Sequence, residues 1–195
     1  MKTFKLEGKS REIIARSADQ KRALKAMRKN DEIPAVLYGG EKVVHFAVTN
    51  DAVRKLVYTP EIFAVELTID GETTMAIVKE IQFHPVSDEI LHIDFLEVSE
   101  NKPVVMEVPV ALEGHAEGVK AGGKLTLSMK KLKVKAIYNA IPEKIVVNID
   151  NIKLGQSLKV GALHYDGLEL INSKNAVVCA VQLTRAARGQ QAAQG

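Results

Sequence analysis

Two side chains suited to acid–base or metal chemistry, His92 and Asp94, stand two positions apart in the run Ile90 to Phe95. Successive side chains of a β-strand point to opposite faces, so a strand here would place both on one face, about 7 Å apart. Such a pair could contact a bound ligand, pair structurally, or begin a metal site or a hydrolytic triad. For a metal site the nearby sequence offers only His84 as a further ligand, and no hydrolase or zinc motif is present.

A second group of residues could neutralise phosphates. In a helix between Lys21 and Asn30, the repeat of 3.6 residues places Lys21, Lys25 and Arg28 in one stripe and the apolar side chains on the other side. No acidic residue lies between Gln20 and Asp31. The stripe therefore has no partner inside its own helix and suits an external polyanion, although a plain solvated helix face is the alternative.

An aromatic residue follows this helix at the end of an apolar strand. Tyr38 stands beside Gly39 and Gly40, and a ring next to bare backbone could support a base or a ribose. Tyrosine at a strand end is also common as plain packing. Upstream, Ser17 and Gln20 have the spacing of a capping box, which predicts where the basic helix begins.

Two other patterns indicate nucleotide or RNA chemistry less strongly. The glycine-rich run 114–124 fails as a phosphate loop, because Leu125 follows Lys124 where a Ser or Thr is required. We interpret that run as a flexible loop of a β domain. A later strand has a basic face, which we expect to be solvated, with a weak RNA contact as the minority alternative; that face consists of Lys131, Lys133 and Lys135.

Two β-rich domains must position these residues. In the first half, alternation and turn residues predict strands near 4–7, 35–38, 43–48, 63–69, 73–83 and 90–98. Helices are expected from Ser17 to Asn30 and over 51–57, the second capped by Thr49 or Asn50. Beyond residue 98 the pattern is short β runs with hardly any helical periodicity. We therefore predict domains at 1–98 and 99–184, followed by a flexible polar tail at 185–195.

Composition restricts the class of protein. Of the 195 residues, 46% are hydrophobic and 26% are charged, which is ordinary for a soluble globular protein. No apolar run is long enough to span a membrane and no secretory signal is evident, so we expect a cytoplasmic location. The single cysteine, Cys179, excludes an intrachain disulfide and is expected to be a buried thiol.

Charge is distributed unevenly along the chain. Residues 1–29 hold ten Lys and Arg against three Asp and Glu, whereas residues 51–95 hold three against nine. This distribution predicts one positive face that comes from the first thirty residues.

These residues together resemble a known family. The pattern consists of Lys25-x-x-Arg28, Ile33-Pro34-Ala35-Val36-Leu37-Tyr38-Gly39, His84-Pro85, His92-Ile93-Asp94-Phe95, Lys102-Pro103-Val104, Val108-Pro109-Val110 and the glycines Gly114, Gly118, Gly122 and Gly123. It resembles the bacterial 5S rRNA-binding ribosomal proteins of the CTC (general stress protein) family, in their long two-domain form. The chain departs from that pattern in two places: the usual glycine before the Ile-Pro pair is replaced in Asn30-Asp31-Glu32, and the segment from Arg11 to Lys21 is longer.

The resemblance implies a mainly β fold. It consists of an N-terminal antiparallel β-barrel with two or three short helices, similar to the anticodon-binding domain of glutaminyl-tRNA synthetase, and a C-terminal all-β domain. The barrel is implied to bind the loop E region of 5S rRNA. The RNA-binding residues, carried over by position, are Arg11, Lys21, Lys25 and Arg28 on phosphates, Tyr38 on ribose or base, and Lys79, Gln82, His92 and Asp94 in the groove.

The implied role is structural and not enzymatic. The expected partners are 5S rRNA and other components of the large ribosomal subunit. No catalytic residue, metal, cofactor, small-molecule substrate or membrane is expected. The alternatives are a general RNA- or tRNA-binding module, a protein adaptor, and, less favoured, a hydrolase that uses His92 and Asp94.

Overall fold

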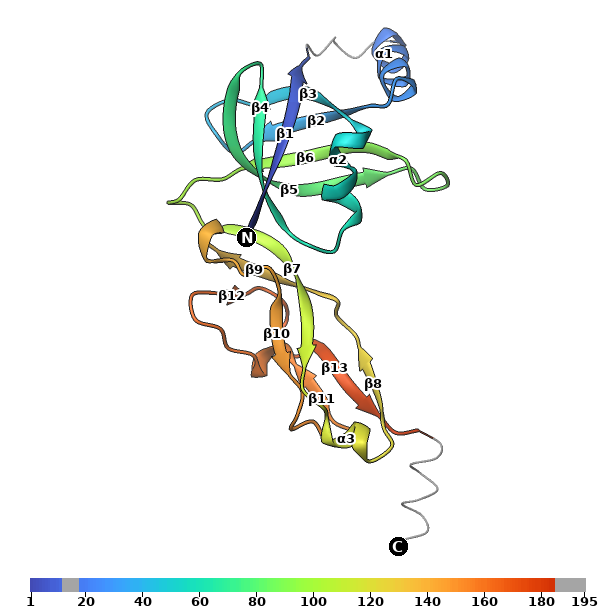
Figure 1. The fold of residues 1–195 in the computed structure, drawn as a ribbon, viewed down its shortest axis with the longest axis vertical. Coiled ribbons are helices and arrows are strands. Elements are labelled where there is room, and N and C mark those ends of the chain that lie inside the picture. Colours follow the sequence, from blue (N-terminus) through green and yellow to red (C-terminus); the bar gives the residue numbers. More distant parts are fainter. Residues whose placement is uncertain (12–17, 185–195) are drawn as a thin grey trace, which may run out of the picture. The chain divides into compact units, whose positions relative to one another are not determined.

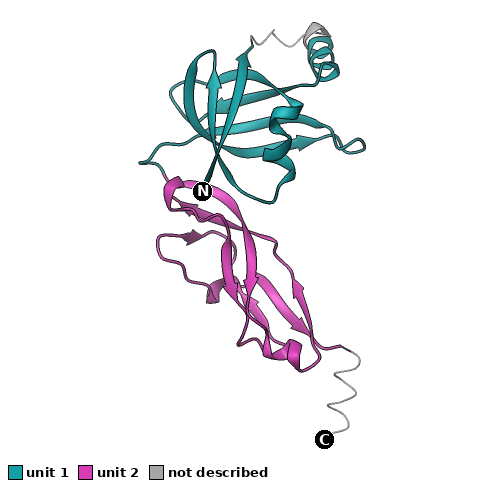
Figure 2. Ribbon diagram, viewed as in Figure 1, with its two compact units in different colours: residues 1–102 teal, residues 103–195 magenta. Residues whose placement is uncertain are grey.

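The computed structural model describes residues 1–11 and 18–184, which divide into two compact units at 1–102 and 103–195 (Figures 1 and 2). The division falls between Lys102 and Pro103. Ser17, half of the expected capping box, and the expected tail at 185–195 lie outside the described residues. Among the helices in the described part of the chain, none is both long and apolar enough to cross a membrane.

The first unit is a closed barrel with strand order β1-β3-β2-β6-β5-β4. Its elements are β1 (Lys2–Ser10), α1 (Ala18–Lys29), β2 (Glu32–Tyr38), β3 (Val44–Thr49), α2 (Asn50–Tyr58), β4 (Phe63–Ile69), β5 (Glu72–Phe83) and β6 (Ile90–Glu97). The predicted mainly β fold with an N-terminal barrel is confirmed. The barrel is mixed rather than purely antiparallel, because β1 pairs with β4 and β2 with β6 in parallel.

Alternation along the strands fills the barrel. In β2 the side chains of Ile33, Ala35 and Leu37 are at most 4% exposed, and in β6 those of Ile93 and Phe95 are fully buried. The Phe95 ring packs on that of Phe46 from β3, with centroids 5.6 Å apart. The residues between these inward positions consequently lie on the outer face of the barrel.

Helix α1 confirms the predicted two-sided pattern. Its Ala23, Leu24 and Met27 are half-buried, whereas the predicted cationic residues Lys21, Lys25 and Arg28 are exposed. The helix projects from the barrel directly ahead of β2 (Figure 1). It therefore presents its charge to solvent from a short arm beside the barrel.

Asp31 ends α1 in a conformation that glycine normally supplies. Its φ is +58°, in the left-handed region. Its carbonyl accepts a hydrogen bond from the backbone N–H of Asn50 at 2.8 Å. Asp31 therefore turns the chain into β2 and also provides an acceptor for the first N–H group of α2. Thr49 occupies the cap position of α2 but makes no side-chain cap bond, so the expected side-chain capping by this residue is wrong.

The second unit is built from two sheets, with strand orders β10-β7-β9-β12 and β11-β13-β8. Its elements are β7 (Val104–Glu113), α3 (Glu117–Lys120), β8 (Lys124–Leu127), β9 (Lys131–Ala136), η1 (Tyr138–Ala140), β10 (Ile145–Asn148), β11 (Ser157–Lys159), η2 (Val160–Ala162), β12 (Glu169–Leu170) and β13 (Val177–Gln182). The predicted C-terminal β domain is confirmed. Cys179 of β13 is fully buried as expected, and this burial raises the pKa of its thiol.

This unit contains the glycine-rich run 114–124 and the basic strand β9, the two weaker patterns of the sequence. The run 114–124 is not a flexible loop: it contains α3, where Gly118 is buried and donates its N–H to Ile152 O at 2.9 Å. A Cβ at Gly118 would meet the Leu154 backbone nitrogen at 2.5 Å, so only glycine packs there. On β9, Lys133 and Lys135 lie beside carboxylates of neighbouring strands, Glu107 at 3.8 Å and Glu169 at 3.1 Å. Those charges are balanced within the unit.

Candidate nucleic-acid interface

The outer face of strands β3, β2, β6 and β5 carries a continuous row of side chains. Strand register places His45 opposite Val36, Val36 opposite Asp94, and Asp94 opposite Glu80. All of these are half-buried or exposed, whereas the residues on either side of Val36 in β2 and of Asp94 in β6 are buried in the core. Residues from four strands therefore converge on one surface, which we call the outer row.

A bulge in β5 decides which side chains share this face. The pairing steps from Val78 opposite Phe95 to Glu80 opposite Asp94, so Lys79 is an extra residue on β5. Val78 and Ile81 consequently both pack against the core, although strict alternation would put them on opposite faces. The shift brings Gln82 outward, opposite His92.

His92 and Asp94 are paired with each other. Nδ1 of His92 lies 2.7 Å from Oδ1 of Asp94, and each side chain is 25% exposed. An ionised carboxylate only accepts hydrogen bonds, so Nδ1 carries a proton and Nε2 is the ring atom that remains to meet a ligand. In the free protein His92 and Asp94 therefore pair with each other. This hydrogen bond orients both side chains before a ligand binds.

Arg28 connects the basic helix to this surface. Its Nη2 donates to the carbonyl of Leu91 at 3.0 Å. That carbonyl is accessible because Leu91 is an extra residue in β6, between Ile90, opposite Phe83, and His92, opposite Gln82. A guanidinium has five N–H donors, so this bond leaves others for a phosphate.

Arg11 adds a second guanidinium beside the outer row. Its backbone N–H donates to His45 O at 2.8 Å immediately after β1 ends. Its Nε is buried without a hydrogen-bond partner. Burial, and then the positive charge of Arg28, lower the pKa of Arg11. The two guanidiniums are therefore close enough to concentrate positive charge at one place.

His45 is a member of the outer row that the sequence analysis missed. Burial lowers the pKa of His45, and electrostatic interactions with Arg11 and then His92 lower it further. The only available signal was the alternation of His45 with the buried Phe46 in β3. Alternation places a residue outside the barrel but does not say which strand lies beside it.

Tyr38 lies on the outer side of β2, two residues after Val36. Burial raises the pKa of Tyr38, and the charges of Asp94 and Glu80 raise it further, which places its hydroxyl near the acidic part of the row. Gly39, which follows it, has φ +100°, a backbone conformation that favours glycine. Gly39 therefore supports the turn after β2.

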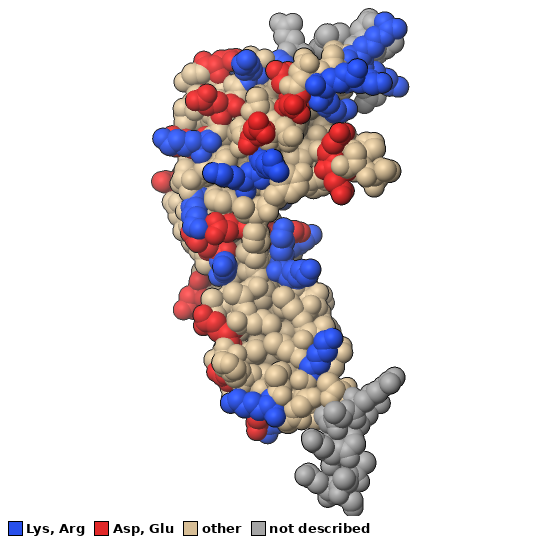
Figure 3. Space-filling view, turned by 45° about the vertical axis from the view of Figure 1, so that its right-hand side comes forward, with Lys and Arg blue, Asp and Glu red and all other residues tan. Residues whose placement is uncertain are grey.

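The expected RNA-binding residues divide into two groups. Arg11, Arg28, Tyr38, Gln82, His92 and Asp94 lie on or beside the outer row, with Lys79 at the β5 bulge. Lys21 and Lys25 stand on α1, and Figure 3 shows Lys and Arg side chains gathered over that helix. Within the described residues no cluster of three or more His, Cys, Asp or Glu could hold a metal ion.

Two protein families match the chain. The Ribosomal L25p family matches residues 6–95, and the C-terminal domain of ribosomal protein TL5 matches residues 103–185. A large ribosomal subunit protein bL25 from Parabacteroides distasonis is 78% identical over 98% of this chain and 99% of that protein. The bL25 of Bacteroides fragilis is 62% identical over the full length of both chains, and that of Porphyromonas gingivalis is 62% identical over 97% of each.

The relatives are ribosomal proteins and not enzymes, in agreement with the expected non-enzymatic role. Both units of the chain are covered by these matches. The chain therefore belongs to the Ribosomal L25p family, in the form that also carries the TL5 C-terminal domain.

Proposed function

We propose that this protein is a structural constituent of the large ribosomal subunit and that it binds 5S rRNA, in the loop E region, through its first unit. The observation that carries the proposal is the convergence of Arg11, Arg28, Tyr38, His92 and Asp94 on one barrel face, next to a basic helix. The names of the relatives, large ribosomal subunit proteins, support the assignment to that subunit.

The two groups of residues would divide the work of recognition. Lys21 and Lys25, on a solvent-exposed arm, would neutralise phosphates and set the position of the RNA without reading its sequence. The outer row offers a paired His92 and Asp94 and the amide of Gln82, which can donate and accept hydrogen bonds. Irregular RNA helices present a groove that such side chains can enter, whereas a regular A-form major groove excludes them.

The barrel would supply rigidity. Side chains on paired strands lose little freedom on binding, and the His92–Asp94 hydrogen bond already holds that pair in place. The interface is therefore expected to recognise shape with little rearrangement.

The direct test is binding of the full chain to purified 5S rRNA, with tRNA as competitor, across a salt series. If about four phosphates are neutralised, log Kobs should fall with log salt at a slope of about −3 to −4. Tight binding that excess tRNA does not displace would support the proposal. Weak binding that tRNA abolishes would mean that the basic helix binds RNA in general and not 5S rRNA in particular. No binding at any salt concentration would favour the protein-adaptor alternative.

A further inference from the structure

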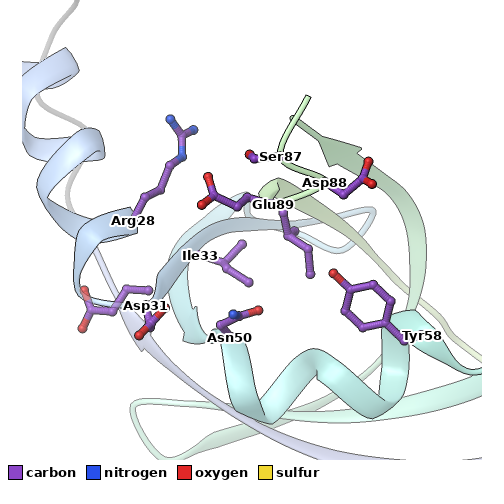
Figure 4. Close-up of a pocket in the computed structure, with 10 residues that line it drawn as sticks. Arg28, Asp31, Ile33, Asn50, Tyr58, Ser87, Asp88 and Glu89 are labelled. Carbon is purple, nitrogen blue, oxygen red and sulfur yellow. The ribbon is translucent and has the colours of Figure 1, made fainter. Parts of the chain in front are cut away.

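A cavity of about 230 Å³ lies in the first unit, and Arg28, beside the outer row, forms part of its wall. It is bounded by the end of α1, the start of β2, both ends of α2 and the loop between β5 and β6 (Figure 4). Ile33 and Ile90 lie at its base and are almost completely buried, so polar and charged side chains form most of its wall. Tyr58 stands across Ile33 from Arg28, and its side chain is 59% exposed.

The rim of this cavity is acidic. Four carboxylates line it against one cation, Arg28; they are Asp31, Glu32, Asp88 and Glu89. The guanidinium of Arg28 is bonded to a backbone carbonyl, that of Leu91, rather than to a carboxylate. The cavity therefore carries an excess of negative charge that its own arginine does not cancel.

Backbone hydrogen bonds hold the rim in place. On one side Asp31 O accepts the N–H of Asn50 at 2.8 Å. On the other side the N–H of His84 donates to Glu89 O at 2.8 Å, and the N–H of Asp88 donates to His84 O at 3.0 Å. The backbone that carries the carboxylates is therefore held in place on both sides of the cavity.

We propose that this cavity binds an arginine side chain that a neighbouring basic protein presents. The volume lies below the range of about 300 to 1,000 Å³ that small-molecule sites occupy, and it suits a single long side chain. The guanidinium of that arginine would meet the exposed face of Tyr58, and the rim carboxylates would accept its N–H groups.

Charge complementarity selects this occupant over RNA. A phosphate placed here would face four carboxylates, and a like charge at such a distance opposes binding. The end of β5 and the loop that follows it add apolar contact area, because Phe83 is 43% exposed and Val86 is 87% exposed. An acidic pocket beside exposed apolar side chains is the pattern of a protein-binding surface with one buried anchor.

The test uses the full ¹⁵N-labelled chain and two short peptides, acetyl-Ala-Arg-Ala-amide and the same peptide with citrulline in place of arginine. Citrulline keeps the shape of arginine and removes its charge. We expect the arginine peptide to shift the amide signals of Asn50, Tyr58 and Ser87 and to bind about fivefold to tenfold more tightly than the citrulline peptide. The double variant Glu32→Gln/Glu89→Gln should weaken arginine-peptide binding by a similar factor.

Glu72→Gln is the matched control, since Glu72 is exposed on the same unit and does not line the cavity. It should leave the affinity unchanged. Equal affinity for the two peptides, or shifts outside the cavity, would overturn the proposal. The proposal would also be overturned if 5S rRNA, and not the arginine peptide, shifted the amide signals of the cavity residues. Because the peptides contain no RNA, these results are independent of the proposed 5S rRNA binding.

Discussion

The Arg28 guanidinium donates a hydrogen bond to the carbonyl of Leu91, with Nη2 and O 3.0 Å apart. Leu91 is the extra residue at the β6 bulge, so an irregularity in the strand supplies the acceptor that joins α1 to the barrel. Arg28 also lines the acidic cavity and lowers the pKa of Arg11. One side chain thus lies between the proposed RNA face and the proposed protein-binding cavity.

Arg28→Ala should weaken binding of 5S rRNA by about 5- to 30-fold, because a guanidinium contact to a phosphate is worth roughly 1 to 2 kcal/mol. The hydrogen bond to Leu91 is exposed, so the free energy of unfolding should fall by less than about 1 kcal/mol. Filter binding and urea unfolding measure the two effects. Unchanged affinity with an intact salt slope would remove Arg28 from the RNA interface.

The double variant Lys21→Ala/Lys25→Ala should reduce the steepness of the salt dependence. Each lost phosphate contact lowers the slope of log Kobs against log salt by about 0.7 to 0.9. Lys133→Ala is the control, since Lys133 is exposed but pairs with Glu107 in the other unit. If this control changes the slope as much as the helix variants do, the binding is a general effect of positive charge.

His45 should make folding stability depend on pH. Its pKa is lowered in the folded protein by burial and by Arg11 and His92, so the unfolded chain takes up a proton first as pH falls. The contribution of His45 is complete above about pH 6.5, the unfolded value, and is lost as pH falls toward the folded pKa. His45→Gln should therefore flatten the decline of unfolding free energy between about pH 7 and 5, measured by urea titration. An identical decline in both proteins would show that other groups cause it.

How far the sequence predicts this molecule depends on the range of each interaction. The two faces of α1 and the strands on either side of Asp70-Gly71 follow from local periodicity, and both were predicted. The parallel pairs that close the barrel join strands far apart in the chain, and no local pattern encodes them. The bulges at Lys79 and Leu91 break alternation by one residue, so alternation alone does not place Gln82 on the face of His92; before the structure, only the family resemblance grouped them.

Asp31→Gly tests why this chain tolerates an aspartate in a backbone conformation that glycine normally supplies. Asp31 has φ +58°, a conformation that costs a residue with a Cβ about 1 to 2 kcal/mol, although Asp and Asn bear it best. Glycine removes that cost but loses more entropy on folding, so the variant should be neutral or more stable by up to about 1 kcal/mol. Asp31→Val, a β-branched residue, should be clearly destabilised in the same urea titration.

The Asp31→Gly variant also separates the effect of Asp31 on folding stability from the effect of its carboxylate on peptide binding. The bond that satisfies Asn50 comes from the Asp31 backbone carbonyl, so it survives the substitution while one rim carboxylate is lost. Stability should therefore hold while arginine-peptide affinity falls about twofold to fivefold, the loss of one partly exposed charge contact. A variant that keeps full peptide affinity would place the bound guanidinium away from the α1 side of the cavity, beside Asp88 and Glu89.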